Sequence, residues 1–397
     1  MERLSAEEFE RIRNCYTRLN DSFPETLIFR VGSSSGFYSE ACSMMECMMF
    51  CYLNNIRFSL YSADANFSKA GRGWREFFDS FCPENHQHWN QSFNHRHSPP
   101  ALRQIIKDSL SGKMGLSDQV RNWLSLAGRH LLLKKEGAKY LTNDFFKVFT
   151  SAHFKSSPIH WPLFSMDGSV YPEIAKLFPY AMRHNQETHE EITQIRNSLG
   201  LPNSYASVQM RGGDKIAKLE RRGDVSDART LSAAHSYIRK LDESGVQISD
   251  IFVQTDDYSY ISALEKAHPE WTIYTLARPD HNGYNQKQFN AMDWKQKRLD
   301  LVRLFAAVEI CRDSTIHFGH EMSNVNTVIK TGRPANSYKK NLPSSWELMM
   351  EDRKGTNRLA CQLVELPCIA TGIRGTGKPA LPSTSTIIRL VSKYTCQ

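Results

Sequence analysis

The stretch Thr26–Tyr61, TLIFRVGSSSGFYSEACSMMECMMFCYLNNIRFSLY, contains two apolar segments separated by a glycine-bearing loop and a segment of helix length. The outer segments, Thr26–Val31 and Ile56–Tyr61, are rich in β-branched and aromatic residues, which predicts two buried strands. Gly32–Gly36 predicts a flexible loop, and Ser39–Leu53 predicts a buried helix whose cysteines and methionines fill a core. Strand, loop, helix and strand in this order form a βαβ unit, which implies a parallel sheet.

A second series of strands and helices follows in the C-terminal half of the chain. Apolar segments of strand length alternate there with helical patterns, at a spacing typical of a doubly wound parallel sheet. Over the whole chain, further strands are predicted at 205–210, 249–255, 271–275 and 314–318, and further helices at 4–20, 101–111, 117–134, 142–154, 186–199, 230–243, 258–267 and 296–311.

The break between the two series is Gly200-Leu-Pro202, which ends the helical pattern before it. Because 397 residues exceed the size of one hydrophobic core, we predict an α/β protein with two domains, each built on a parallel sheet. The first domain is 1–200, and the second is 201–345. A Gly-, Pro-, Ser- and Thr-rich stretch at 371–386 indicates that 346–397 is an extension.

The composition is that of an ordinary globular protein, with 40% hydrophobic and 23% charged residues. The N-terminus, MERLSAEEFE, is acidic where a signal peptide is basic and then apolar, and no apolar run approaches the about 18 residues that cross a bilayer. We therefore expect a cytoplasmic protein, or one from which a targeting segment has been removed. Nine dispersed cysteines without a Cys-x-x-Cys motif indicate reduced thiols.

The formal net charge of +8 favours an anionic partner. Lys and Arg are spread over the whole chain, without the basic patch or the recognisable module that indicates nucleic-acid binding. A phosphorylated small molecule fits the same charge, and we expect no nucleic-acid partner.

Two His-x-His pairs, His86/His88 and His95/His97, have a spacing that could ligate zinc or nickel. Their surroundings are rich in Pro, Asn and Gln, and Glu84 is the only nearby acid. This context favours a surface loop, and we predict no metal site.

Polar and charged residues follow three of the predicted C-terminal strands: Arg211-Gly-Gly-Asp-Lys215, Thr255–Asp257 and Met322–Asn324. In an open parallel sheet, ligands bind outside the carboxyl ends of the strands. Arg and Lys supply charge and donors for phosphate, glycines let backbone amides approach an anion, and carboxylates accept from hydroxyl or base N–H groups. These strand ends suit a nucleotide sugar. The alternative is a structural ion pair between Arg211 and Asp214 at a turn.

Five motifs resemble the α-1,6-fucosyltransferase family and its nodulation relatives, in the same order along the chain. Val208–Lys215, VQMRGGDK, is similar to that family's His-Val-Arg-Arg-x-Asp-Lys stretch, and Gln254–Asp257 is similar to its Ala-Thr-Asp-Asp. Ser323–Val325 resembles its Ser-Ser-Gln/Asn-Val. Gly36–Ser39 and Gly71–Glu76 resemble a glycine loop and a Gly-Gly-Trp-Glu motif in the N-terminal half. The similarity spans about 27–330.

The resemblance implies a glycosyltransferase of the GT-B type, an α/β fold with two Rossmann-like domains facing a cleft. The N-terminal domain, 1–200, would lie on the acceptor side, and the C-terminal domain, 201–345, would bind the nucleotide sugar. Such an enzyme would use GDP-fucose, invert the anomeric centre and need no obligatory metal or other cofactor. By motif position, Arg211 would bind the donor pyrophosphate and stabilise the departing GDP, Lys215 would assist near the reacting centre, and Asp214 would brace their loop. Gly36 and Phe37 would cover the donor from the first domain. The donor-binding residues that the resemblance implies are Gly36, Phe37, Gln209, Arg211, Asp214, Asp256, Asp257, Ser323 and Asn324.

The chain departs from the family pattern at four places. The motif histidine is Gln209, which can still hydrogen-bond a nucleotide, and the second arginine is Gly212. The position of the family's base aligns with Leu219, so Glu220, one residue further on, is the candidate base. An aspartate of the helix before the last strand has only Asp300 as a loose substitute.

The leading hypothesis is fucosyl transfer from GDP-fucose to the hydroxyl of a glycan or glycoconjugate acceptor. Two alternatives stay open: a GT-B transferase that uses another nucleotide sugar, and a catalytically inactive protein that binds a nucleotide or carbohydrate. Glu40 and Asp64 are further candidates for the base, although a helix-start carboxylate and a surface turn are the favoured interpretations of these two residues.

Overall fold

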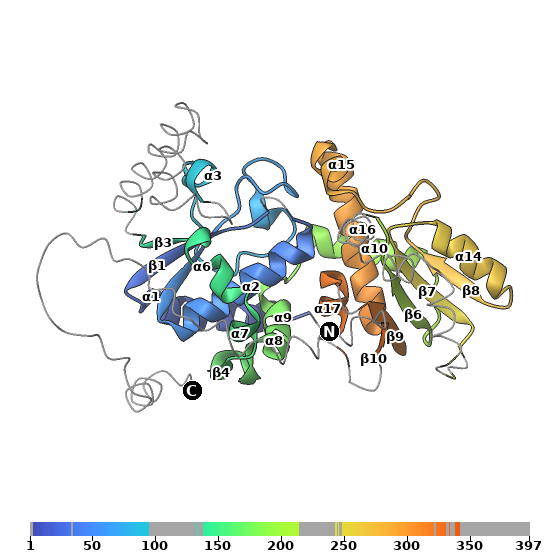
Figure 1. Ribbon diagram of the computed structural model, residues 1–397, viewed down its shortest axis with the longest axis horizontal. Coiled ribbons are helices and arrows are strands. Elements are labelled where there is room, and N and C mark those ends of the chain that lie inside the picture. Colours follow the sequence, from blue (N-terminus) through green and yellow to red (C-terminus); the bar gives the residue numbers. More distant parts are fainter. Residues whose placement is uncertain are drawn as a thin grey trace, which may run out of the picture. The chain divides into compact units, whose positions relative to one another are not determined.

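The computed structural model describes residues 3–32, 35–94, 138–213, 248–320, 323–330 and 338–341, together with the single residues 133, 243, 245 and 333. These residues form two parallel sheets and one antiparallel hairpin (Figure 1). Met1–Pro343 is one compact unit, and Ser344–Gln397, which contains the predicted extension, is a second. Apart from residues 133 and 243, the helices predicted at 101–111, 117–134 and 230–243 lie outside the described residues, and so does the extension.

The N-terminal sheet contains the predicted βαβ unit. Its order is β2-β1-β3, and both pairs of neighbours are parallel. Strands β1 (Glu25–Arg30) and β2 (Ile56–Tyr61) are joined by helix α2 (Phe37–Leu53), as predicted. Strand β3 (Tyr140–Leu141) was not predicted, because two residues are too few to show a period; pairing with Leu27–Ile28 of β1 defines it.

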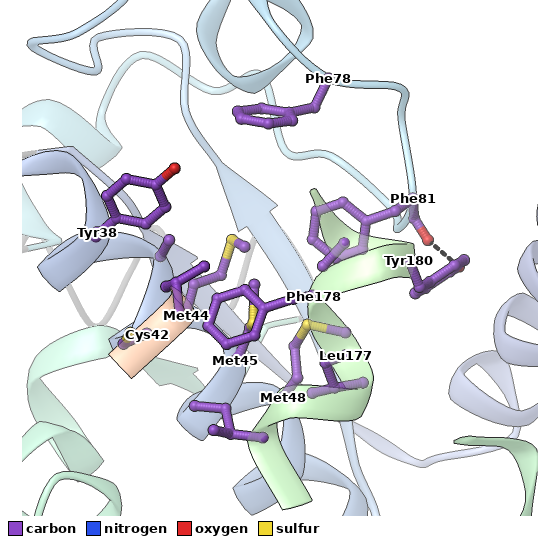
Figure 2. Packing of buried hydrophobic residues seen from close by; sticks show 14 of the residues in the cluster. Tyr38, Cys42, Met44, Met45, Met48, Phe78, Phe81, Leu177, Phe178 and Tyr180 are labelled. Carbon is purple, nitrogen blue, oxygen red and sulfur yellow. Dashed lines mark hydrogen bonds between the residues drawn. The ribbon is translucent and has the colours of Figure 1, made fainter. Parts of the chain in front are cut away.

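Helix α2 is buried along almost its whole length, as expected for a helix that is apolar on every side. Met44, Met45 and Met48 point toward Leu177 and Phe178 in the core (Figure 2). The flexible thioethers of α2 therefore fill the core beside Leu177 and Phe178, which confirms the prediction that the methionines of this helix fill a core. The six described cysteines are free thiols, and three of them belong to α2.

The C-terminal sheet has five parallel strands in the order β10-β9-β6-β7-β8. The central strand β6 is buried at every position, because it has a neighbour on each side and helices against the sheet. The strand and helix bounds are β6 (Ala206–Met210), β7 (Asp250–Thr255), α14 (Ser259–Ala267), β8 (Thr272–Thr275), α16 (Trp294–Asp313), β9 (Ile316–His320) and β10 (Tyr338–Asn341).

The helix predicted at 142–154 is two helices, α6 (Thr142–Phe149) and α7 (Ala152–Lys155). The hydroxyl of Ser151 accepts a hydrogen bond from the N–H of Phe154 at 3.1 Å and so starts a new helix. The remaining elements are α1 (Ala6–Asp21), η1 (Gly73–Glu76), α3 (Asn90–Phe93), β4 (Pro158–Trp161), η2 (Pro162–Phe164), β5 (Met166–Ser169), α8 (Val170–Glu173), η3 (Ile174–Leu177), α9 (Phe178–Ala181), α10 (Gln186–Ser198), α15 (Gln286–Ala291) and α17 (Asn324–Lys330).

The proposed division at residue 200 lies in the loop between α10 and β6. Helix α10 packs against α16 (Figure 1), and Arg196 of α10 forms ion pairs with Glu309 and Asp313. Burial opposes ionisation of Glu309, but the imidazole of His184 and the guanidinium of Arg196 hold its pKa at about 2.

No helix in the described part of the chain is both long enough and apolar enough to span a bilayer.

Candidate functional site

The glycine loop after β1 is held in place by a buried carboxylate. Glu40, in the first turn of α2, accepts hydrogen bonds from the N–H groups of Gly32 (2.9 Å) and Ser35 (3.0 Å). Gly32 has a φ of +76°, and a Cβ there would lie 2.6 Å from the ring of Phe67, so only glycine fits. Glu40 therefore anchors the loop, in agreement with its interpretation as a structural helix-start carboxylate.

The loop after β6 carries Arg211, and Asp256, which directly follows the neighbouring strand β7, organises it. Asp256 accepts from Arg211 Nη1 (2.7 Å) through Oδ2 and from the N–H of Gly212 (2.7 Å) through Oδ1. The N–H of Tyr284 also donates to Oδ2, at 3.1 Å. The Arg211 guanidinium lies over the Tyr284 ring, 5.4 Å from its centroid. One carboxylate thus fixes both the arginine and the backbone beside it.

Two glycines allow the 211–213 loop to approach the 282–285 loop. Gly213 and Gly283 have φ values of +58° and +91°. A Cβ on Gly213 would lie 2.4 Å from the backbone nitrogen of Tyr284, and a Cβ on Gly283 would lie 2.6 Å from the Cα of Gly213. The close contact between the two backbones brings the Tyr284 ring under Arg211.

The third strand end, after β9, rests on a buried polar network. The His317 imidazole contacts the Ser207 hydroxyl at 2.7 Å through Nδ1 and the Asn326 side-chain oxygen at 3.2 Å through Nε2. Burial, assisted by the charge of Arg333, lowers the pKa of His317 to about 3, so the imidazole is neutral near pH 7. Ser323, which precedes α17, is buried beside this network.

These strand ends line one cavity of about 720 Å³. Its wall contains all of 35–39 after β1, 209–211 at the end of β6, 252–256 at the end of β7 and 323–325 after β9. The loop after β8, from Leu276 to Gln286, supplies most of the rest, with one face of α16. A cavity of this size, with guanidinium groups and hydroxyls at its wall, suits a polar ligand with phosphate groups.

No family model matches the chain, and neither does any curated protein. The fold is similar to solved structures of fucosyltransferases. Fucosyltransferase NodZ from Bradyrhizobium is 8% identical, with a TM-score of 0.41 over 78% of this chain and 91% of that one. POFUT1 in complex with GDP-fucose is 10% identical, with a TM-score of 0.43 over 80% and 98%. A variant of Arabidopsis thaliana FUT1 in complex with GDP is 10% identical, with a TM-score of 0.41 over 84% and 76%.

Most of the residues that the motifs single out are gathered at this cavity. Asp257 is not part of its wall, because its carboxylate accepts from the N–H and the hydroxyl of Ser259 at the start of α14. Asp214, Lys215 and Glu220 lie outside the described residues. The cavity wall includes Gly36, Phe37, Gln209, Arg211, Asp256, Ser323 and Asn324.

Phe37 belongs to the cavity wall, and its ring packs against other aromatic side chains. Its side chain is buried, with its centroid 4.9 Å from that of Phe305 on α16 and 5.8 Å from that of Trp74. The ring therefore fixes the start of α2 and the loop before it, rather than standing free in the cavity.

Sequence reasoning missed Arg278, Tyr284 and Arg303, which also line the cavity. Arg278 and Tyr284 follow β8, so the rule that ligands bind at strand ends already pointed to their loop. Arg303 lies on α16, where that rule gives no signal. Asp300, the loose substitute, is at the wall and accepts from Arg278 at 3.4 Å and from Gln296 at 2.8 Å.

The described residues contain no group of three His, Cys, Asp or Glu side chains that could hold a metal ion. Of the four histidines in the two His-x-His pairs, only His86 and His88 lie within the described ranges.

Proposed function

We propose that this chain is a GT-B type glycosyltransferase that transfers fucose from GDP-fucose to a glycan hydroxyl. The observation that carries the proposal is the position of Arg211 at the wall of the cavity, held by Asp256 and Tyr284. The motif resemblance of Val208–Lys215 supports GDP-fucose as the donor. The fold similarity to fucosyltransferases is compatible with this proposal.

The chemistry requires a stabilised leaving group. As the bond between the anomeric carbon and the donor phosphate breaks, negative charge develops on the diphosphate. A guanidinium that is already held in position stabilises this charge without reorganisation, and such electrostatic stabilisation is usually the largest single contribution to catalysis. We propose that Arg211 does this, that no metal ion is required, and that Glu220 removes the proton of the acceptor hydroxyl. Attack from the face opposite to the leaving GDP would invert the anomeric centre.

A nucleotide panel followed by a turnover assay tests the proposal. Calorimetry with GDP, UDP and CDP is expected to give the tightest binding for GDP. Mass spectrometry with GDP-fucose is then expected to show hydrolysis, or transfer to simple sugar acceptors, and the rate is expected to persist in EDTA. Absence of nucleotide binding would refute the proposal as a whole, whereas loss of turnover in EDTA would refute only metal independence.

The two alternatives predict different results in the same panel. A preference for UDP or CDP would indicate a transferase with another nucleotide sugar. Binding of GDP without hydrolysis or transfer would indicate a binding protein, which the replacement of the family's histidine and second arginine by Gln209 and Gly212 would permit.

A further inference from the structure

Helix α16 presents one face to the cavity. The residues of this face are Asp300, Leu301, Arg303, Leu304 and Ala307, spaced three and four apart as neighbours on a helix surface are. Arg303 is the only cation among them. Its side chain is thus directed to the same space as Arg211, although the two residues lie on different elements.

Three arginines and three aspartates of the described residues line the cavity: Arg211, Arg278, Arg303, Asp256, Asp280 and Asp300. Arg211 is paired with Asp256, and Arg278 is paired with both Asp280 and Asp300. Arg303 forms no ion pair within the described residues. Without it, the described wall would carry a net negative charge and would repel a diphosphate.

Arg303 also carries a donor without an acceptor. Its Nη1 is buried and has no hydrogen-bond partner among the described residues. A buried donor that is left unsatisfied destabilises a folded protein, so such groups are rare unless water or a ligand completes them. An oxyanion in the cavity would supply both the acceptor and the opposite charge.

We propose that Arg303 is a second cation for the diphosphate of the nucleotide sugar, an assignment that rests on the proposed function. In the family that the motifs resemble, the second arginine is next to the first, but here that position is Gly212. A Cβ on Gly212 would lie 3.3 Å from both Asp256 Oδ1 and Asp257 Cβ, so a side chain there would crowd both aspartates. Arg303 supplies the charge from the helix instead.

The test combines Arg303→Met with a matched control, Lys295→Met. Lys295 is on the same helix, is exposed and is not part of the cavity wall. We expect Arg303→Met to weaken the binding of GDP and of inorganic pyrophosphate by about 10–100-fold each, the range for a charge-assisted hydrogen bond. Arg303→Lys keeps the charge and is expected to recover part of the affinity, whereas Lys295→Met should bind both ligands as the wild type does.

Thermal unfolding without ligand separates a binding role from a structural one. Because Arg303 Nη1 makes no hydrogen bond within the described residues, Arg303→Met should leave the Tm of the free protein unchanged or raise it. A lower Tm together with unchanged affinity would assign a structural role to Arg303 and overturn the inference.

The ligand panel distinguishes the remaining outcomes. Weaker GDP binding with unchanged pyrophosphate binding would place Arg303 at the base or the sugar and would overturn the diphosphate assignment. Wild-type affinity of Arg303→Met for both ligands would refute the inference alone. A wild-type protein that binds no nucleoside diphosphate would refute the proposed function, and this inference with it.

Discussion

The loop after β1 and the loop after β6 are both held in place by a carboxylate, but the two carboxylates come from different parts of the chain. Each follows the carboxyl end of a parallel strand, contains glycines and is held by one carboxylate. In the first loop the carboxylate is Glu40 of the next helix, eight residues from Gly32 and five from Ser35. In the second it is Asp256, which follows a neighbouring strand and lies 45 residues from Arg211 in the sequence.

This difference separates the roles of the two loops. Glu40 accepts hydrogen bonds from the backbone N–H groups of Gly32 and Ser35, so these two groups are not available to an anion. Asp256 instead aligns a guanidinium at the cavity wall. We therefore propose that the C-terminal loop contributes to charge recognition and that the N-terminal loop contributes to the shape of the cavity. Substitution of Asp256 should then mainly affect turnover, whereas substitution of Glu40 should mainly affect the free energy of unfolding.

The largest effect is expected for Arg211→Ala, which removes the charge from the C-terminal loop. By analogy with the loss of a fixed electrostatic donor, kcat should fall by roughly 10²–10³. GDP affinity should also fall, because the cavity wall loses a guanidinium. Initial rates measured by mass spectrometry with GDP-fucose provide the check. Unchanged turnover and unchanged GDP binding would show that the diphosphate does not contact this loop.

Asp256→Asn should have the next largest effect, because it loosens the arginine without removing it. The amide keeps one acceptor oxygen but loses the charge, so the N–H groups of Arg211, Gly212 and Tyr284 can no longer all be satisfied. We expect kcat/KM to fall by about 10–100-fold, the cost of disrupting a charge-assisted bond at a site of this kind.

A double-variant cycle tests whether Asp256 acts through Arg211. The effects of Arg211→Ala and Asp256→Asn on kcat/KM should not add, because the two residues act as one unit. Asp257→Asn gives the geometric comparison. Its carboxylate accepts from Ser259 and is not at the cavity wall, so its effect should be smaller than that of Asp256→Asn. Equal effects for the two aspartates would favour the motif assignment of Asp257 to the donor.

Gly213→Ala should mainly reduce the free energy of unfolding. Alanine at a φ of +58° is strained, and its Cβ would meet the Tyr284 backbone at 2.4 Å. Gly200 is the matched control, since it has a φ of +60° with no atom within 4 Å of a Cβ. Urea unfolding should give a loss of about 1 kcal/mol for Gly200→Ala and about 2–3 kcal/mol for Gly213→Ala. Equal losses would mean that the two backbones do not need this close contact.

The sequence was sufficient to predict most of the larger elements. Strands β1 and β2 and helix α2 have strong local patterns, so both kinds of element were recognisable along the chain. Strands β3 and β10 have two and four residues, and long-range pairing defines them. A local pattern contains no information about such pairing, which is why these strands were missed.

The site was predictable to the extent that it lies at strand ends. The structure pairs Arg211 with Asp256, which no local pattern links to it, whereas Asp214, its partner in the alternative interpretation, lies outside the described residues. The register of the two strands explains this pairing. Met210 of β6 lies beside Thr255 of β7, so the residues that follow them, Arg211 and Asp256, are also neighbours. Arg303 was not predictable in this way, because its position depends on how α16 packs over the sheet.

The smallest effect is expected for Glu40→Gln, the counterpart of Asp256→Asn in the N-terminal loop. Glutamine preserves the shape and one acceptor, but its amide N–H₂ would face the N–H of either Gly32 or Ser35. One buried donor would lose its partner, at a cost of about 1–2 kcal/mol in the free energy of unfolding. Turnover by the folded protein should change less than in Asp256→Asn, since no charge at the cavity wall is affected. If Glu40→Gln instead reduced kcat as strongly as Asp256→Asn at equal folded fraction, Glu40 would take part in the reaction, and the division between a shaping loop and a charge-bearing loop would fail.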